Sequence, residues 1–244
     1  MLKFPVAIAL LLLTSCATFS TPRECEFCNQ RSVARLPLVE RSAERGGSAI
    51  ALLLTGDWGW QPFEDALSTQ LAADGVPVIA LISPEYFARR RTIGETASAI
   101  EQVIRLYSSV WHRRQILLIG YSRGAGVLPF VVSRLPPDLR RRITEVTLIG
   151  LGSNIDFRVR RRLPFWTAHD ELQIPVRPEV DKLRGLNVVC VQGEDEDESL
   201  CPKLPPGLAQ KMVEPGGHSL DVDPRELARK IEAVSKPALV LRAN

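Results

Sequence analysis

Short apolar runs alternate with longer amphipathic stretches along most of this chain, from Leu36 onward. The apolar runs are rich in Val, Ile and Leu and have the length of strands, whereas the stretches between them carry apolar residues at helical spacing. This alternation is typical of βαβ units, in which parallel strands form a sheet and helices cover its faces. The sequence therefore predicts an α/β fold with a mostly parallel sheet flanked by helices.

The order of these segments predicts one domain over residues 36–236, followed by a tail over 237–244. The 244 residues, 45% of them hydrophobic and 24% charged, suffice for one such domain with a large buried core. An arginine-rich stretch around residues 153–178 interrupts the alternation, and we expect it to be an insertion. The sequence predicts strands over 49–54, 76–82, 115–119, 146–151, 188–192 and 210–213, and helices over 62–73, 93–107, 124–134 and 224–233.

The N-terminus has the features of an export signal. A short basic start precedes an apolar run over residues 6–13, which is too short to span a bilayer but long enough for the centre of a signal peptide. The run leads into Leu13-Thr14-Ser15-Cys16, which resembles the lipobox of bacterial lipoproteins. We therefore expect residues 1–15 to be removed and Cys16 to carry a lipid. The alternatives are an ordinary signal peptide cleaved nearby and a cysteine that is buried at this position by chance.

A lipid on Cys16 would make the membrane a partner of this chain and place the chain in the periplasm. By resemblance to bacterial lipoproteins, the absence of Asp at Ala17 favours the outer membrane over the inner one. Residues 16–35 are then expected to form a tether between the anchor and the domain.

The chain has five cysteines, and lipidation of Cys16 leaves four that can form two disulfides in an oxidising compartment. Cys25 and Cys28 lie in the tether, whereas Cys190 and Cys201 flank an acidic loop that a disulfide would restrain. We expect pairing within each couple. A redox-active role for the first couple is disfavoured because no strand precedes it.

Three arginine clusters contrast with a formal net charge of only +3. Basic clusters can bind nucleic acid, but an exported protein rarely meets it, so we expect no nucleic-acid partner. Anionic lipid headgroups are the preferred partner, and a solvated basic face is the alternative. The clusters are Arg89–Arg91, Arg140–Arg142, and Arg158 with Arg160–Arg162.

The strand predicted at 115–119 runs directly into Gly120-Tyr121-Ser122-Arg123-Gly124, after which a helix is predicted. A G-x-S-x-G nucleophile motif requires this context, because its glycines permit a tight turn that projects the serine from the sheet edge. The N-terminus of the following helix offers N–H groups to developing negative charge. Ser122 is therefore the candidate nucleophile, and a tight turn in a Rossmann-like protein is the alternative.

A serine hydroxyl needs a base, usually histidine, and the chain has three histidines. His112 precedes the strand that leads to Ser122, which places it at the opposite end of the sheet. His169 lies in the insertion and could reach the serine only if that segment folded over it. His218 follows Gly216-Gly217 after the last predicted strand and is the candidate base, with a surface histidine as the alternative.

Five consecutive carboxylates, Glu194 to Glu198, follow the fifth predicted strand. The acid that orients the histidine of a catalytic triad is expected at this place. Spacing from Gly193 selects Glu196, with Asp197 and Asp195 as alternatives. Metal binding by the run is disfavoured because it lacks the glycine and ligand spacing of a calcium-binding loop. We therefore predict no metal and no cofactor.

An oxyanion is usually held by backbone N–H groups of the residue after the nucleophile and of a loop after an earlier strand. In this chain the second position is the loop Gly56-Asp57-Trp58-Gly59-Trp60, which follows the first predicted strand. The backbones of Asp57, Trp58 and Arg123 are therefore the candidate donors. A Gly/Trp turn packed on the core is compatible with this role.

Further short motifs accompany the nucleophile motif along the chain. In order, the motifs are Gly56-Asp57-x-Gly59-Trp60; Tyr86-Phe87 with Arg91-Thr92; Gly120-Tyr121-Ser122-x-Gly124-Ala125-x-Val127-Leu128-Pro129-Phe130; Ser199-Leu200-Cys201-Pro202; and Gly216-Gly217-His218. Together they resemble the bacterial virulence protein VirJ family, which includes the C-terminal half of AcvB, over nearly everything from Leu36 to Ala233. The resemblance implies a periplasmic α/β-hydrolase, and AcvB-like members hydrolyse lysyl-phosphatidylglycerol, an aminoacylated phospholipid.

Two positions depart from the pattern that the resemblance implies. Family members usually carry Asp where this chain has Gly126, and another Asp where it has Ala99. A lysyl ammonium group without a counter-charge binds weakly in a partly dry pocket, although the remaining acids Asp57, Asp221 and Asp223 could substitute.

We therefore expect a serine hydrolase that cleaves esters, with an anionic or aminoacylated phospholipid headgroup as its preferred substrate. A hydrolase of other small esters is one alternative. A non-catalytic periplasmic binding or secretion-assisting protein is another, although such a protein would need neither Ser122 nor His218.

Overall fold

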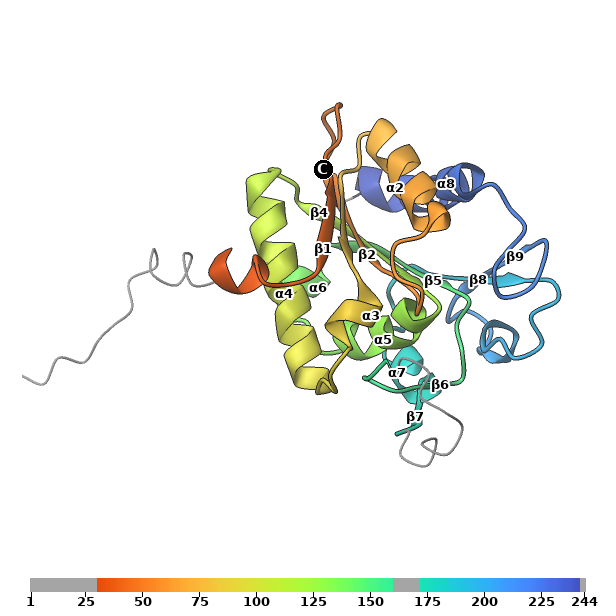
Figure 1. The fold of residues 1–244 in the computed structure, drawn as a ribbon. Coiled ribbons are helices and arrows are strands. Elements are labelled where there is room, and N and C mark those ends of the chain that lie inside the picture. Colours follow the sequence, from red (N-terminus) through yellow and green to blue (C-terminus); the bar gives the residue numbers. More distant parts are fainter. Residues whose placement is uncertain (1–29, 160–171, 242–244) are drawn as a thin grey trace, which may run out of the picture.

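The computed structural model describes residues 30–159 and 172–241, and a seven-stranded sheet lies at the centre of this part (Figure 1). The strand order is β1-β3-β2-β4-β5-β8-β9. β1 runs antiparallel to β3, and the other neighbours are parallel. The predicted α/β fold with a mostly parallel sheet is confirmed. The strands of the sheet are β1 (Leu38–Arg41), β2 (Ala49–Leu54), β3 (Val78–Leu81), β4 (Gln115–Tyr121), β5 (Ile143–Ile149), β8 (Val188–Gly193) and β9 (Gln210–Glu214).

Helices cover both faces of the sheet, so its central strands are buried on both sides. On β2, Leu52 and Leu54 face the core under α4 and α5, whereas Leu53 faces the core under α2 and α8. Burial on both faces explains why the central strands are continuous apolar runs in the sequence. The long helices are α2 (Pro62–Ala73) and α8 (Pro224–Leu241) on one face, and α4 (Ile93–Val110) and α5 (Arg123–Val132) on the other (Figure 1). Shorter helices are α3 (Ser83–Tyr86), α6 (Pro137–Arg140), α7 (Arg177–Asp181) and the 3-10 turn η2 (Cys201–Lys203).

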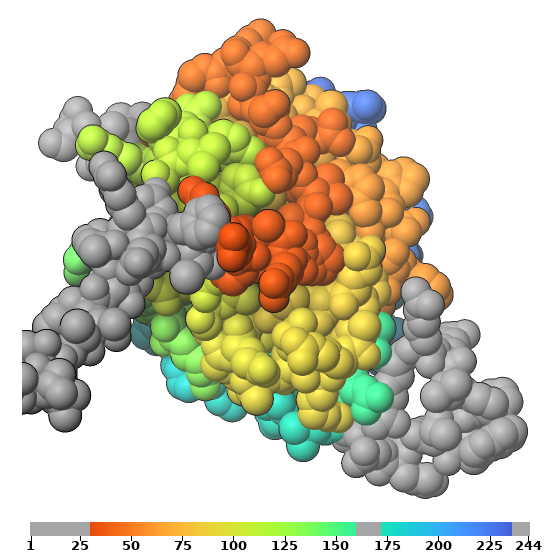
Figure 2. Space-filling model, turned by 60° about the vertical axis from the view of Figure 1, so that its left-hand side comes forward, coloured from red at the N-terminus to blue at the C-terminus, as the bar shows by residue number. Residues whose placement is uncertain are grey.

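The N-terminal segment packs against α4, as Figure 2 shows for the red and yellow-green residues. Val33 is buried in the core, and Ser32 Oγ lies 2.5 Å from Gln102 Oε1 on α4. The packed part of the chain therefore begins before Leu36, where the sequence predicts the domain to start.

The structure extends or refines several predicted segments. The strand predicted at 76–82 is shorter in the structure, where β3 spans Val78–Leu81. The last helix was predicted to end at residue 233. In the structure α8 continues to Leu241, which includes most of the predicted tail. The described part of the predicted insertion contains a small antiparallel pair, β6 (Asn154–Ile155) and β7 (Ile174–Pro175), and the start of α7.

Several predictions fall outside the described residues. They concern the signal peptide, Cys16, the couple Cys25 and Cys28, His169 and Arg160–Arg162. Among the helices in residues 30–159 and 172–241, none combines the length and hydropathy needed to cross a bilayer.

Candidate active site

The topology of the sheet opens a site between β2 and β4. The chain goes from β2 to β3 on one side, and α4 then carries it back across β2 to β4 on the other side. The loops after β2 and β4 therefore diverge at the carboxyl edge of the sheet, which is where open α/β sheets bind ligands. The loop after β2 begins at Thr55, and the turn after β4 contains Ser122.

Ser122 occupies a strained turn between β4 and α5. Its backbone has φ 52° and ψ −111°, which a non-glycine residue rarely adopts. Both flanking glycines are required by close packing: a Cβ on Gly120 would lie 2.5 Å from Gly124 C, and one on Gly124 would lie 2.0 Å from Leu54 O. The turn therefore brings α5 against β2 and projects the serine side chain from the sheet edge.

The structure brings Ser122, His218 and Glu196 into one chain of contacts. His218 Nε2 lies 2.8 Å from Ser122 Oγ, and His218 Nδ1 lies 2.5 Å from Glu196 Oε1. Glu196 Oε2 accepts a hydrogen bond from Gly193 N at 3.3 Å. The three side chains come from three loops at the carboxyl edge of the sheet, and they have the connectivity of a serine–histidine–acid triad.

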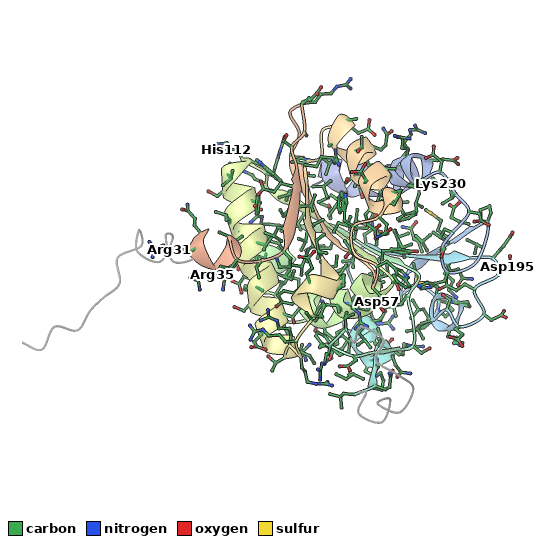
Figure 3. All side chains as sticks on the ribbon, in the orientation of Figure 1. Arg31, Arg35, Asp57, His112, Asp195 and Lys230 are labelled. Carbon is green, nitrogen blue, oxygen red and sulfur yellow. A yellow bond between two sulfur atoms is a disulfide. The ribbon has the colours of Figure 1, made fainter. Side chains whose placement is uncertain are left out.

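Glu196 differs from the other four carboxylates of its loop in exposure. Its side chain is 7% exposed, whereas Glu194, Asp195, Asp197 and Glu198 are exposed. Figure 3 shows Asp195 at the periphery of the molecule. The reason is a turn in which Glu196 N donates to Gly193 O at 3.2 Å and directs the Glu196 side chain inward. The alternatives Asp195 and Asp197 are not brought to the histidine.

The predicted disulfide between Cys190 and Cys201 is present and closes the acidic loop. Cys190 lies in β8, Cys201 lies in η2, and their Cα atoms are 5.6 Å apart. Both cysteines are fully buried. The disulfide therefore anchors both ends of the loop that carries Glu196.

Glycines make room for His218. Gly150, with φ +64°, ends β5 directly against the imidazole: a Cβ there would lie 2.8 Å from His218 Cε1. A Cβ on Gly193 would lie 2.2 Å from Gly217 O, so the glutamate loop and the histidine loop touch through their backbones. The imidazole also lies parallel to the ring of Tyr121, with centroids 6.1 Å apart.

The electrostatic environment favours the protonated imidazole. The hydrogen bond that His218 Nδ1 donates to Glu196 raises the pKa of His218, burial opposes this effect, and the charges of Glu196 and Asp57 add to the increase. A carboxylate at Nδ1 fixes the tautomer that leaves Nε2 free to accept a proton from the serine.

The other histidines stand apart from this arrangement. His112 follows α4, and Figure 3 shows it at the end of the molecule away from Asp57. This is the location that its place before β4 predicts. His169 lies outside the described residues.

The predicted oxyanion donors come from two segments of the chain, the loop after β2 and the residue that follows Ser122. A Cβ on Gly56 would lie 3.3 Å from Ser122 Cβ, so the loop after β2 touches the nucleophile turn. The N–H groups of Asp57, Trp58 and Arg123 take no part in the backbone hydrogen bonds among the described residues. Backbone donors without an internal acceptor, next to a serine, can stabilise an oxyanion.

An ion-pair network beside the serine was not predicted from the sequence. The Arg123 guanidinium contacts both carboxylate oxygens of Asp57, through Nε to Oδ1 and through Nη2 to Oδ2 at 3.3 Å. Its Nη1 donates to the Asp156 carbonyl oxygen, and the Asp156 carboxylate accepts from Arg90 Nη1 at 2.8 Å. The one feature of the sequence that could have indicated this network is Arg123 itself, which occupies the variable position directly after the serine in the G-x-S-x-G motif.

The two positions where the VirJ resemblance implies Asp lie in packed surroundings. A Cβ on Gly126 would lie 3.1 Å from Ile155 Cδ1, so an acidic side chain there would displace Ile155. Ala99 is partly buried on α4 against the core. The chain has therefore filled the space near Gly126 with an apolar side chain.

Residues 30–159 and 172–241 contain no group of three or more His, Cys, Asp and Glu side chains arranged to hold a metal ion.

The sheet, the flanking helices and the serine turn define an α/β-hydrolase fold, and solved structures agree. Est1E from Butyrivibrio proteoclasticus superposes with a TM-score of 0.57 at 14% identity, over 85% of this chain and 94% of that one. MenH from S. aureus gives 0.60 at 12% identity, over 82% and 98%. The esterase domain of a Rhodothermus marinus protein gives 0.54 at 13% identity, over 82% and 97%.

Within this class the sequence identifies the family. Residues 48–237 match the family described as bacterial virulence protein (VirJ), so the chain belongs to that family. A comparison with curated proteins gave no match. The resemblance seen in the motifs is thus confirmed at the level of family and fold.

Proposed function

We propose that this protein is a serine hydrolase that cleaves a carboxylic ester. The observation that carries the proposal is the contact chain from Glu196 through His218 to Ser122, at the carboxyl edge of an α/β-hydrolase sheet. The solved structures with this fold include an esterase domain, which fits the same reaction class.

In the proposed reaction, Ser122 Oγ attacks the ester carbonyl while His218 Nε2 takes its proton. The backbone N–H groups of Asp57, Trp58 and Arg123 hold the negative charge on the carbonyl oxygen. His218 then protonates the leaving alkoxide, which departs as an alcohol and leaves an acyl-Ser122 ester. Water attacks this ester by the same route and releases the carboxylic acid.

A fluorophosphonate probe tests this proposal, because it reacts covalently with an activated serine. Wild type should be labelled, Ser122→Ala should not, and His218→Ala should be labelled slowly if at all. Ser109→Ala, which removes an exposed serine on α4, is the matched control and should be labelled like wild type. Labelling that persists in folded Ser122→Ala contradicts the proposal. Absent labelling of wild type favours the non-catalytic binding or secretion-assisting alternative.

We propose an aminoacylated phospholipid such as lysyl-phosphatidylglycerol as the first substrate to test. The VirJ resemblance supports this choice, and so do the exposed arginines Arg89 and Arg158 on segments joined by the Arg91 N to Phe157 O hydrogen bond. Each basic residue near an anionic membrane contributes about 1 kcal/mol of attraction.

One observation favours a second candidate, namely other small esters. Arg123 already pairs with Asp57, and Asp223 caps the start of α8 by accepting from Arg225 N at 3.0 Å. Two of the three acids that could attract a lysyl ammonium therefore have partners. Incubation of the purified domain with lysyl-phosphatidylglycerol and with simple acyl esters separates the candidates: lysine release supports the first, and cleavage of the acyl esters alone supports the second.

We further propose that the chain is held at the periplasmic side of a membrane by a lipid on Cys16, with the outer membrane favoured. Cys16→Ser should leave the signal unprocessed or move the protein from the membrane to the soluble fraction. Cys25→Ser changes a neighbouring cysteine and should leave the fractionation unchanged. A mature N-terminus away from Cys16, without lipid, would reject the anchor.

A further inference from the structure

We infer that the ion pair between Arg123 and Asp57 is a positioning device that holds the two halves of the oxyanion hole in register. The inference rests on the proposed serine hydrolase function and adds two positioning side chains to it. The backbone N–H groups of Asp57 and Arg123 are candidate oxyanion donors, whereas the ion pair gives their side chains a separate role.

The two halves of the hole come from separate parts of the chain. One half is the loop after β2, which carries Asp57, and the other is the first residue of α5, Arg123, which is bonded to Ser122. No peptide bond fixes the distance between the two N–H groups. The guanidinium supplies a fixed link, because Nε and Nη2 contact the two carboxylate oxygens of Asp57 side by side.

A third contact fixes the guanidinium itself. Arg123 Nη1 donates to the carbonyl oxygen of Asp156, whose carboxylate is held by Arg90. The Arg123 side chain is only 13% exposed, so water competes weakly for its donors. A planar guanidinium can serve three acceptors at fixed angles, and a lysine ammonium cannot reproduce this geometry.

The other restraints on the loop lie mostly within it or toward the core. The Trp58 side chain is 81% exposed and adds little burial to the loop. Within the loop, Gly59 N donates to Gly56 O at 3.2 Å and Gln61 Nε2 donates to Trp58 O at 2.8 Å, and Trp60 packs against the core. The backbone of Gly56 touches Ser122, since a Cβ there would lie 3.3 Å from Ser122 Cβ, but neither hydrogen bond joins the loop to α5. Among the described residues, the ion pair is thus the polar side-chain link between the loop after β2 and α5.

An oxyanion hole accelerates a reaction only when its donors are held where the charge develops. Loss of the link should therefore lower kcat and leave the KM for substrate nearly unchanged. We expect Arg123→Met and Asp57→Asn each to lower kcat by about ten- to a hundredfold. This loss is no larger than the loss of kcat on removing one oxyanion donor completely, which is about a hundred- to a thousandfold. The double variant should be little worse than either single variant, because both remove the same link.

The experiment compares these variants with a matched ion pair elsewhere. Arg105 and Asp138 form an equally bidentate pair, with contacts of 2.8 and 3.3 Å between α4 and α6, and Arg105→Met removes it. For each purified variant we would measure kcat and KM on a simple acyl ester, the affinity for a boronic acid transition-state analogue, and the thermal midpoint. The analogue should lose affinity in Arg123→Met in proportion to kcat/KM, and Arg123→Lys should recover only part of it.

Three outcomes would overturn the inference. Wild-type kcat in folded Arg123→Met, an equal loss in Arg105→Met, or a change in KM without a change in analogue affinity would each show that the pair does not position the hole. An inactive wild type that no fluorophosphonate labels would instead overturn the proposed function, and this inference with it.

Discussion

At the scale of single residues, each part of the candidate site depends on one residue and its contacts. Glu196 lies within 2.5 Å of His218, Gly150 lies beneath the imidazole, and Gly120 and Gly124 permit the backbone conformation of Ser122. Residues elsewhere in the chain that lack the contact serve as controls, so the effect of losing a contact can be separated from the effect of the substitution itself.

The contact between Glu196 and His218 predicts the pH dependence of turnover. A base must be neutral to accept a proton, so kcat/KM should rise with pH through the pKa of His218, which Glu196 holds above its ordinary value near 6.5. Glu196→Gln removes the negative charge, and the midpoint should move to lower pH while the plateau falls. A pH profile of ester hydrolysis measures both effects. Asp195→Asn, which removes an exposed charge of the same loop, should leave the midpoint close to wild type, and an equal shift in that control would contradict the assignment.

Gly150 predicts a steric effect on the base. Gly150→Ala places a methyl group 2.8 Å from His218 Cε1 at a residue with φ +64°, so it should displace the imidazole and lower kcat by about tenfold or more. The backbone strain should also cost roughly 1 kcal/mol of stability. Gly207→Ala imposes the same kind of strain, with φ +74° and no atom within 4 Å of the new Cβ. Both variants should lose stability in urea titrations, but only Gly150→Ala should lose turnover.

At the scale of elements, the sequence predicted most of the sheet because its signals are local. The bounds of β2 and α2 agree with the prediction, since β2 is a continuous apolar run and Pro62 marks the first turn of α2. β1 was not predicted, because its four residues Leu38–Arg41 form a short, partly exposed edge strand with no continuous apolar run.

In the candidate site, too, the residues with a local sequence signal could be predicted and the contacts between distant loops could not. Ser122 and His218 could be placed from motifs and chain order, and Glu196 from its spacing after Gly193. The pair of Arg123 and Asp57 could not, because it joins residues 66 positions apart and depends on how two loops meet. The catalytic roles of all these residues stay predictions that the variants test.

The loop between β8 and η2 predicts a link between the disulfide and turnover. Replacing both cysteines, Cys190→Ala with Cys201→Ala, frees the ends of the loop that carries Glu196 and should destabilise the fold by roughly 2–4 kcal/mol. The remaining folded protein should show a lower kcat, because Glu196 would no longer hold one orientation of the imidazole. Urea titration and ester kinetics under conditions where the variant stays folded measure the two effects. Full turnover in the folded double variant would show that the loop keeps its shape without the disulfide.

At the scale of the whole molecule, the sheet separates two apolar cores, and polar groups connect the layers at the end away from Ser122. Glu145 on β5 is buried, accepts from Thr147 Oγ1 at 2.5 Å, and accepts from Ser235 Oγ on α8 at 2.5 Å. It therefore joins the central sheet to the last helix. The packing of α8 on the sheet therefore depends on whether the Glu145 carboxyl group is protonated.

Glu145 predicts how the stability of the fold depends on pH. Burial raises its pKa to about 7 from an ordinary value of 4.5, although the hydroxyls of Ser235 and Thr147 oppose the increase. Between these two values the folded chain keeps the proton and the unfolded chain releases it, so the free energy of unfolding should fall as pH rises from about 4.5 to 7. Glu145→Gln cannot ionise, and its stability relative to wild type should therefore increase over that interval by on the order of 2 to 3 kcal/mol. Urea titrations at several pH values measure this difference directly. Glu226→Gln, which changes an exposed glutamate on α8, serves as the control, and a constant difference between Glu145→Gln and wild type across the interval would show that Glu145 does not titrate there.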